Sequence, residues 1–171
     1  MVNSAVLSKF YVKSVRTKTA TRLSSGFTLI ELVVTIAVVG IFAAIAMPSF
    51  SGMIANNKSS GIATDLYFSL AKARSEAVKR NTDVTLAPNS GGWKKGWSIY
   101  PTNEADNILE DHSISGANVS MSGPGSVKYN SSGRIGGSAS FDIEATVGSA
   151  SAKTCVTVSL SGLPNVKKSA C

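Results

Sequence analysis

The feature that most constrains this chain is a long apolar segment near its N-terminus, residues 27–47. Glu31 is the only charged side chain in it, and the hydroxyls of Thr28 and Thr35 are the only other polar groups. As an α-helix with a rise of about 1.5 Å per residue, the segment would be about 30 Å long, which matches the hydrocarbon core of a bilayer. We therefore expect a membrane-spanning helix.

The residues before this segment indicate its orientation. Residues 1–26 carry five basic side chains and no acidic one: Lys9, Lys13, Arg16, Lys18 and Arg22. A basic flank stays on the cytoplasmic side, so the rest of the chain is expected outside the cytoplasm. Those five residues also explain most of the formal charge of +7, because the remaining chain has 12 basic and 10 acidic side chains. The charge thus reflects membrane orientation and not a nucleic-acid partner.

Glu31 is the anomaly of the apolar segment. A charged side chain in a membrane helix is unfavourable by about 3 kcal/mol near the centre and by less toward the ends, so an ionisable group there suggests a function. The surrounding residues, Gly26-Phe27-Thr28-Leu29-Ile30-Glu31-Leu32, resemble the prepilin signature of type IV pilins and type II secretion pseudopilins. Pro48 stands where such pilins usually carry a helix-bending proline.

The resemblance implies a processing and assembly site. A prepilin peptidase would cut between Gly26 and Phe27 on the cytoplasmic side and methylate the new amino terminus of Phe27. Glu31 would then pair with the Phe27 ammonium of a neighbouring subunit when the helices bundle into a filament. This role agrees with the physics of burial, because a carboxylate removed from water needs a partner. The implied partners are other pilins or minor pilins, the peptidase and the inner membrane.

A secretory signal peptide is the alternative interpretation of the same residues. The basic start, the apolar core and the small residues Ala44-Ile45-Ala46 fit such a signal, and the mature chain would then begin at Met47. The apolar run exceeds the usual core of about 7–15 residues, however, and this interpretation does not explain Glu31. We therefore expect a leader at 1–26 and a transmembrane or filament-core helix at 27–52, bent at Pro48.

The helix is expected to continue beyond the membrane as an amphipathic segment, residues 53–80. One stripe of apolar residues recurs at helical spacing: Ile62, Leu66, Leu70, Ala73 and Ala77. Charged residues occupy other faces, and Arg80-Asn81 suits a helix C-terminus. Because a sheet-forming region follows, the stripe is expected to pack against it rather than lie on a membrane surface.

Residues 82–171 are expected to form the β-rich part of an extracytoplasmic domain, 53–171. Short β-like runs are separated by Gly, Ser, Asn and Pro: Asp83–Ala87, Trp97–Tyr100, Asn118–Met121, Ser126–Tyr129, Ser140–Glu144 and Thr154–Leu160. This order of elements, with Gly-Trp-Ser-Ile-Tyr at 96–100, resembles the GspH/FimT/FimU branch of minor pilins and pseudopilins. The implied fold is α+β, the type IV pilin fold, with a long N-terminal helix packed on an antiparallel β-domain.

Two cysteines lie in the segment expected outside the cytoplasm, Cys155 and Cys171. An oxidising compartment makes a disulfide between them the expected state. A metal site is not expected, because His112 is the only histidine and there is no CxxC pair; His112 fits an ordinary loop or surface position. No cofactor is expected.

The sequence contains no enzyme motif: no P-loop, no GxSxG and no Ser-His-Asp arrangement.

Members resembling FimT bind DNA through a C-terminal Gly-Arg-x-Arg motif, and the corresponding place here is Gly162-Leu163-Pro164-Asn165, without either arginine. Lysines remain near that end as candidates for weak, salt-sensitive contact with DNA phosphates: Lys153, Lys167 and Lys168.

These patterns lead to one expected function and two alternatives. The expected function is a minor pilin, a structural, initiating or tip subunit of a type IV pilus, with one inner-membrane helix and a periplasmic domain. The first alternative is a pseudopilin of a type II secretion system. The second is a DNA-binding minor pilin that takes part in DNA uptake.

Overall fold

The computed structural model describes residues 26–116 and 118–171, with the side chains of 45–49 excepted. The chain divides into two units, one ending at Val38 and the other running Val39–Cys171. The elements are a single long helix followed by strands: α1 (Leu29–Arg80), β1 (Val84–Pro88), the 3-10 turn η1 (Trp93–Lys95), β2 (Gly96–Pro101), β3 (Glu110–Ser113), β4 (Val119–Ser122), β5 (Val127–Tyr129), β6 (Ala139–Val147), β7 (Ala150–Val158) and β8 (Pro164–Lys167). This is the α+β architecture expected from the sequence.

Helix α1 ends where the sequence predicts, and its last turn explains why. Asn81 adopts a left-handed conformation with φ 52°. Its N–H donates to the Val78 carbonyl, and the Thr82 N–H donates to the Ala77 carbonyl, both at 3.2 Å. This pair of bonds is a Schellman motif, in which Asn replaces the more usual Gly. The basic residues of the last turn, Lys79 and Arg80, also suit the negative end of the helix dipole.

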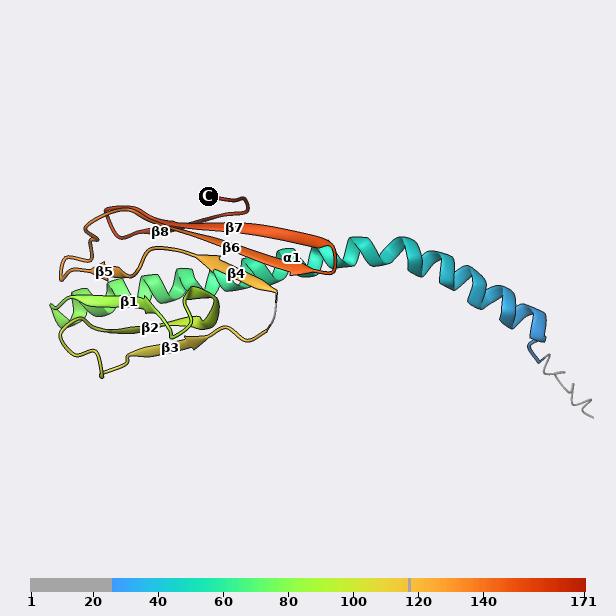
Figure 1. Ribbon diagram of the computed structural model, residues 1–171, viewed down its shortest axis with the longest axis horizontal. Helices are drawn as coiled ribbons and strands as arrows, with labels where there is room; N and C mark the ends of the chain where they lie inside the picture. Colours follow the sequence, from blue (N-terminus) through green and yellow to red (C-terminus); the bar gives the residue numbers. More distant parts are fainter. Residues whose placement is uncertain (1–25, 117) are drawn as a thin grey trace, which may run out of the picture. The chain divides into compact units, whose positions relative to one another are not determined.

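The strands form two four-stranded sheets, in the orders β3-β2-β1-β5 and β4-β6-β7-β8. Every strand pairing in them is antiparallel. Figure 1 shows both sheets flanking the C-terminal part of α1. The long hairpin of β6 and β7 anchors the second sheet, with Phe141 opposite Val156 and Ile143 opposite Thr154.

The core lies between the helix and the two sheets. The predicted helical stripe is confirmed, because all five of its residues are buried: Ile62, Leu66, Leu70, Ala73 and Ala77. They pack with buried residues of both sheets, among which Trp97, Tyr129 and Phe141 are the largest. Trp93 in η1 joins the two sheets, since its ring meets the Phe141 ring edge-on at 4.9 Å and its Nε1–H donates to the Pro124 carbonyl at 2.7 Å.

Two strands differ from the sequence-based expectation. β3 was missed because its residues, Glu110–Ser113, are all polar and show no apolar alternation. β8 was missed because it is short and begins with Pro164, which is tolerated at a sheet edge. The structure also places His112 in β3 and not in a loop, with its ring stacked on Trp97 at 4.3 Å.

Among the described residues, no helix combines the length and the apolar character that a membrane crossing requires. The crossing predicted for residues 27–47 remains a prediction, and it includes residues 45–47, whose side chains lie outside the described set. The bend predicted at Pro48 also concerns a side chain outside that set, although its backbone belongs to α1.

Candidate processing and assembly site

The Gly26–Phe27 peptide bond lies immediately before the helix. Residues 26–28 have no regular secondary structure, and α1 begins at Leu29. The Phe27 side chain is 84% exposed, and a Cβ added to Gly26 would meet no atom within 4 Å. The packing of the described residues therefore does not require glycine at position 26.

Glu31 has a local role that the sequence-based interpretation missed. Its Oε2 accepts hydrogen bonds from the Thr28 N–H and the Thr28 hydroxyl, both at 3.1 Å. In return, the Glu31 N–H donates to Thr28 Oγ1 at 3.2 Å. This reciprocal arrangement is a capping box, which satisfies N–H groups that the first turn of a helix leaves unpaired. Its signature was readable as Thr28-Leu29-Ile30-Glu31, a Thr followed three residues later by Glu.

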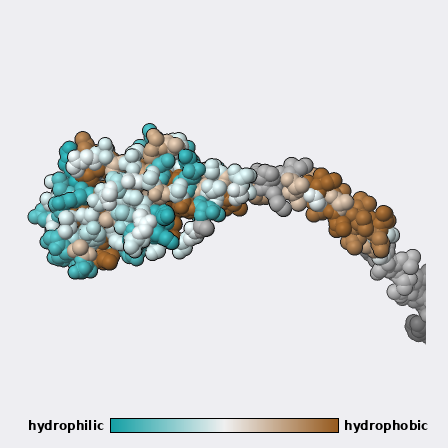
Figure 2. All heavy atoms as spheres, viewed as in Figure 1, coloured by the Kyte–Doolittle hydropathy of each residue, from teal (hydrophilic) through white to brown (hydrophobic). Residues whose placement is uncertain are grey.

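Glu31 also lies on an apolar surface of α1. A shallow hollow of about 410 Å³ on this surface is lined by Glu31 and four neighbours: Ile30, Val34, Thr35 and Val38. All of these side chains are exposed. On the face that Figure 2 shows, this part of the helix is mostly brown, the colour of hydrophobic residues. An isolated chain in water would leave a large apolar area solvated, and exposed patches of this kind mark protein or membrane contacts.

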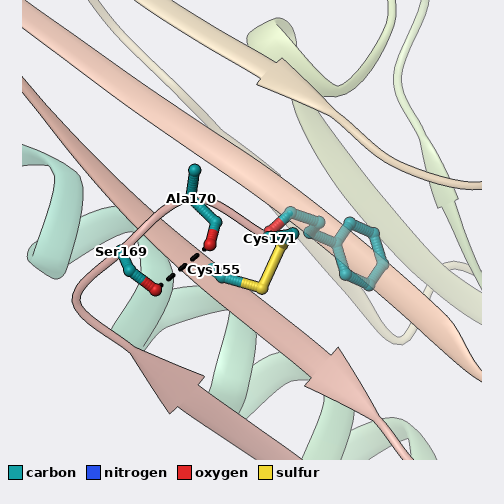
Figure 3. The surroundings of a disulfide bond; sticks show 5 residues. Cys155, Ser169, Ala170 and Cys171 are labelled. Carbon is teal, nitrogen blue, oxygen red and sulfur yellow. Dashed lines mark hydrogen bonds between the residues drawn. A yellow bond between two sulfur atoms is a disulfide. The ribbon is translucent and has the colours of Figure 1, made fainter.

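Cys155 and Cys171 form the disulfide that the sequence predicts, with their Cα atoms 5.0 Å apart (Figure 3). Cys155 is buried in β7, opposite Asp142 of β6 and Lys167 of β8. The sulfur of Cys171 lies 3.1 Å from the Phe141 carbonyl oxygen. That distance is a close contact and not a hydrogen bond, since a disulfide sulfur carries no proton. The bridge holds the residues after β8 against the second sheet.

The structure brings together two of the three candidate DNA-contacting lysines. Lys153 in β7 and Lys167 in β8 are diagonal neighbours, because Lys167 pairs with Cys155. Lys168 follows directly, and all three are exposed. Glu144, however, pairs with Lys153 across the hairpin, with Nζ to Oε2 at 3.5 Å. The positive potential of this group is therefore partly neutralised.

The Tyr129 side chain is buried in the core. Burial raises the pKa of the Tyr129 hydroxyl, and the charge of Arg74 opposes this effect. Within residues 26–116 and 118–171, no group of His, Cys, Asp and Glu side chains could hold a metal ion.

Comparison with known families decides the class. A family model described as Type II transport protein GspH matches residues 63–162. The chain belongs to this family. A second model, the Prokaryotic N-terminal methylation motif, matches residues 21–47, which include Gly26, Phe27 and Glu31. The chain is thus a type IV pilin-like protein of the minor pilin and pseudopilin class, and this class implies assembly with other pilins in a filament.

The fold is similar to that of the type IV minor pilin FimU from Pseudomonas aeruginosa strain PAO1. One crystal form gives a TM-score of 0.56 at 20% identity, covering 65% of this chain and 89% of FimU. A second crystal form of FimU gives a TM-score of 0.50 at 19% identity, covering 63% of this chain and 91% of FimU. At this identity the likeness shows the fold, which is the type IV pilin fold. Comparison with curated proteins gives no match.

Proposed function

We propose that the protein is a minor pilin of a type IV pilus, a structural, initiating or tip subunit that assembles through its N-terminal helix. The observation that carries this proposal is Glu31, a carboxylate on an exposed apolar helix surface within the matched methylation motif. A type IV minor pilin has a similar fold, and the proposal is consistent with it.

Processing at Gly26–Phe27 is part of the proposal. A prepilin peptidase would need access to an extended peptide bond, and this bond precedes the first helical residue, Leu29. Cleavage would release Phe27 as a new, methylated amino terminus. Leader removal would take away the basic residues of 1–26 and leave an apolar segment that begins at the mature terminus.

Glu31 then has two alternative partners, Thr28 of its own chain and the Phe27 ammonium of a neighbour. The stronger interaction with the ammonium would drive assembly. In the single chain, its carboxylate caps its own helix through Thr28. Neutral donors such as these leave the net charge uncompensated in an apolar environment, where a charge is most unfavourable. The Phe27 ammonium of a neighbouring subunit would supply both a donor and the opposite charge. The pairing would therefore favour the filament over the lone subunit in the inner membrane.

The proposed location follows from the same arrangement. Residues 27–52 would anchor the unassembled subunit in the inner membrane as a single-pass helix, and the β-domain would lie in the periplasm. The disulfide between Cys155 and Cys171 is compatible with that oxidising compartment.

The capping box allows the docking role of Glu31 to be tested separately from its local role. Glu31→Val should leave membrane insertion intact and abolish incorporation into filaments. Thr28→Val is the matched control, because it removes the hydroxyl of the cap and keeps the carboxylate. We expect Thr28→Val to incorporate at near wild-type levels, measured by immunoblotting of sheared filaments. Equal loss in both variants would reduce Glu31 to a helix cap, and normal incorporation of Glu31→Val would refute docking.

A pseudopilin of a type II secretion system is the second candidate, and the description of the matching GspH family favours it. The two candidates differ in the machine that assembles them. Deleting the assembly ATPase of the pilus should abolish recovery of the protein in filaments if it is a minor pilin. Loss only after deletion of the secretion ATPase would assign it to the pseudopilus.

DNA binding stays a prediction for the lysine group. The full chain in detergent should retain DNA at low salt, and Lys167→Glu together with Lys168→Glu should abolish this retention. The ion pair of Lys153 with Glu144 and the absence of both motif arginines weigh against it.

A further inference from the structure

Strand β8 leaves one edge of the second sheet open. Among the described strands it pairs only with β7, through residues 164–167. The Ser159 N–H donates to the Leu163 carbonyl at 3.2 Å. Because hydrogen-bonded and non-hydrogen-bonded pairs alternate in an antiparallel ladder, the backbone N–H and C=O of Val166 face away from β7. The backbone of Pro164 also faces away from β7, so the lack of an N–H in proline costs no hydrogen bond to β7.

An apolar groove lies beside this open edge. It has a volume of about 550 Å³ and two walls. Tyr67, Ala71 and Val78 of α1 form one wall, and Leu163 and Pro164 form the other. The Leu163 side chain is 55% exposed, and Tyr67 and Val78 are exposed as well. The helix surface under the edge of β8 is therefore left without a cover from the sheet.

The charges around the groove are positive. Arg74 and Lys79 line its helical wall, and the Arg74 Nε–H donates to the Gly133 carbonyl at 2.9 Å, which fixes the guanidinium in place. Lys167 and Lys168 belong to the open strand and its end. No acidic residue follows Glu144 in the sequence. Glu76 pairs with Lys79 and Arg80, so it offsets part of the charge of the helix but not that of Arg74.

We propose that the β8 edge and this groove bind an extended segment of a neighbouring filament subunit, in which apolar and acidic side chains alternate. An added strand would lie about 4.8 Å beyond β8, and alternate side chains would point toward the sheet's inner face. Val166 lies on that inner face, because it pairs with Val156, which is buried. The apolar side chains of the added strand would enter the groove, and the acidic ones would meet the lysines.

Edge protection alone does not explain these features. Proline and lysine at an edge do deter non-specific pairing, and β8 carries Pro164 and Lys167. Protection does not require an apolar groove under the same edge, however. Together the two features make the edge selective, because lysines repel a basic strand and attract an acidic one. The identity of the occupant as a filament subunit rests on the proposed function. The docking of a strand at the β8 edge does not depend on it.

The direct test measures peptide binding to the full chain in detergent by fluorescence anisotropy. The probe is a labelled short peptide in which valine and glutamate alternate, and its controls carry lysine for glutamate or N-methylated alternate backbone amides. We expect binding of the acidic peptide to be at least about tenfold tighter than that of either control. Equal binding of all three peptides, or none by the acidic one, would overturn the proposal whether or not the chain enters filaments.

Two variants locate the binding. Val166→Pro removes an outward N–H that β7 does not use, and Leu163→Glu places an acid in the groove; each should weaken binding by about tenfold or more. Ile108→Glu is the matched control, because Ile108 is 56% exposed before β3 in the other sheet, and it should bind normally. Full binding by Leu163→Glu would contradict the groove assignment. If the wild-type chain dimerises by itself and Leu163→Glu abolishes the dimer, the groove would instead be assigned to a second copy of this chain.

Discussion

The Ser59 hydroxyl lies 3.1 Å from the Thr154 hydroxyl, and this contact joins α1 to β7 inside the domain. Both side chains are buried. The Ser59 hydroxyl also lies 3.2 Å from the Asn56 carbonyl, so it has a partner within its own helix. The pair therefore links β7, one of the two central strands of the second sheet, to the helix through a polar contact within a mostly apolar interface.

A double-mutant cycle measures what this contact contributes. Ser59→Ala should lower the free energy of unfolding by about 1–2 kcal/mol, because it leaves the Thr154 hydroxyl buried without that partner. Thr154→Val should have a smaller effect, since Ser59 keeps the Asn56 carbonyl. The double variant should lose less than the sum of the two. Additive losses in urea denaturation would show that the hydroxyls are not coupled.

Neighbouring residues of α1 should respond very differently to truncation. Leu66 is fully buried in the core, whereas Phe68 is 62% exposed. Leu66→Ala should lower the free energy of unfolding by about 2–5 kcal/mol through lost burial and a cavity. Phe68→Ala should change it by less than about 0.5 kcal/mol. Similar losses in both variants would contradict the assignment of the buried helix stripe.

The disulfide should contribute measurably to stability. Cys155 and Cys171 are separated by 16 residues, and closing a loop of this size stabilises by about 3 kcal/mol in the chain-entropy model. Reduction of the folded chain should therefore lower its melting temperature. The double variant Cys155→Ser with Cys171→Ser is the control, and a reductant should leave its midpoint unchanged. An equal midpoint of the oxidised and reduced wild type would refute this contribution.

The polar contact between β3 and α1 should make stability depend on pH. Glu110 Oε2 lies 2.7 Å from Lys72 Nζ, and Oε1 accepts a hydrogen bond from Ser69 at 2.6 Å. Partial burial raises the pKa of Glu110, but the bonds from Lys72 and Ser69 lower it more, so the pKa lies below its ordinary value of 4.5. The unfolded chain then binds this proton more readily, and the stabilisation is lost as the pH falls below about 4.5.

Glu110→Gln tests this linkage. At pH 7 the variant should be less stable than the wild type by at most about 1 kcal/mol, since the pair is partly exposed. The difference should shrink as the pH falls below about 4.5, in thermal melts at several pH values. Phe68→Ala, which changes an exposed side chain without an ionisable group, should show no such trend. A difference for Glu110→Gln that persists at low pH would contradict an ionised Glu110 as its cause.

Local sequence patterns predicted the parts of the fold that depend on one element. The stripe from Ile62 to Ala77 and the helix end at Asn81 follow from helical spacing and C-terminal preferences, and both agree with the structure. The pairing of strands into two sheets depends on contacts between distant residues, which no local pattern contains. β3 escaped detection for a related reason, because its side chains contact residues on other elements, Lys72, Ser69 and Trp97.

The roles of the candidate site residues stay predictions, and the local chemistry of Glu31 was not predicted. The prepilin resemblance identified Gly26, Phe27 and Glu31, and the methylation-motif match covers all three. The interpretation of Glu31 as a carboxylate in need of a partner overlooked Thr28, which stands three residues before it. The groove beside β8 could not be predicted, because it requires Leu163 to lie next to a helix residue as distant in sequence as Tyr67.

The most direct test of the account is the N-terminal residue of the protein recovered from cells, read by intact mass and terminal peptide sequencing. We predict a chain that begins at N-methylated Phe27, and that Gly26→Ser accumulates as the uncleaved precursor although its fold is unchanged. A mature chain that begins at Met47, or filaments that contain the chain with Met1 still in place, would contradict the account.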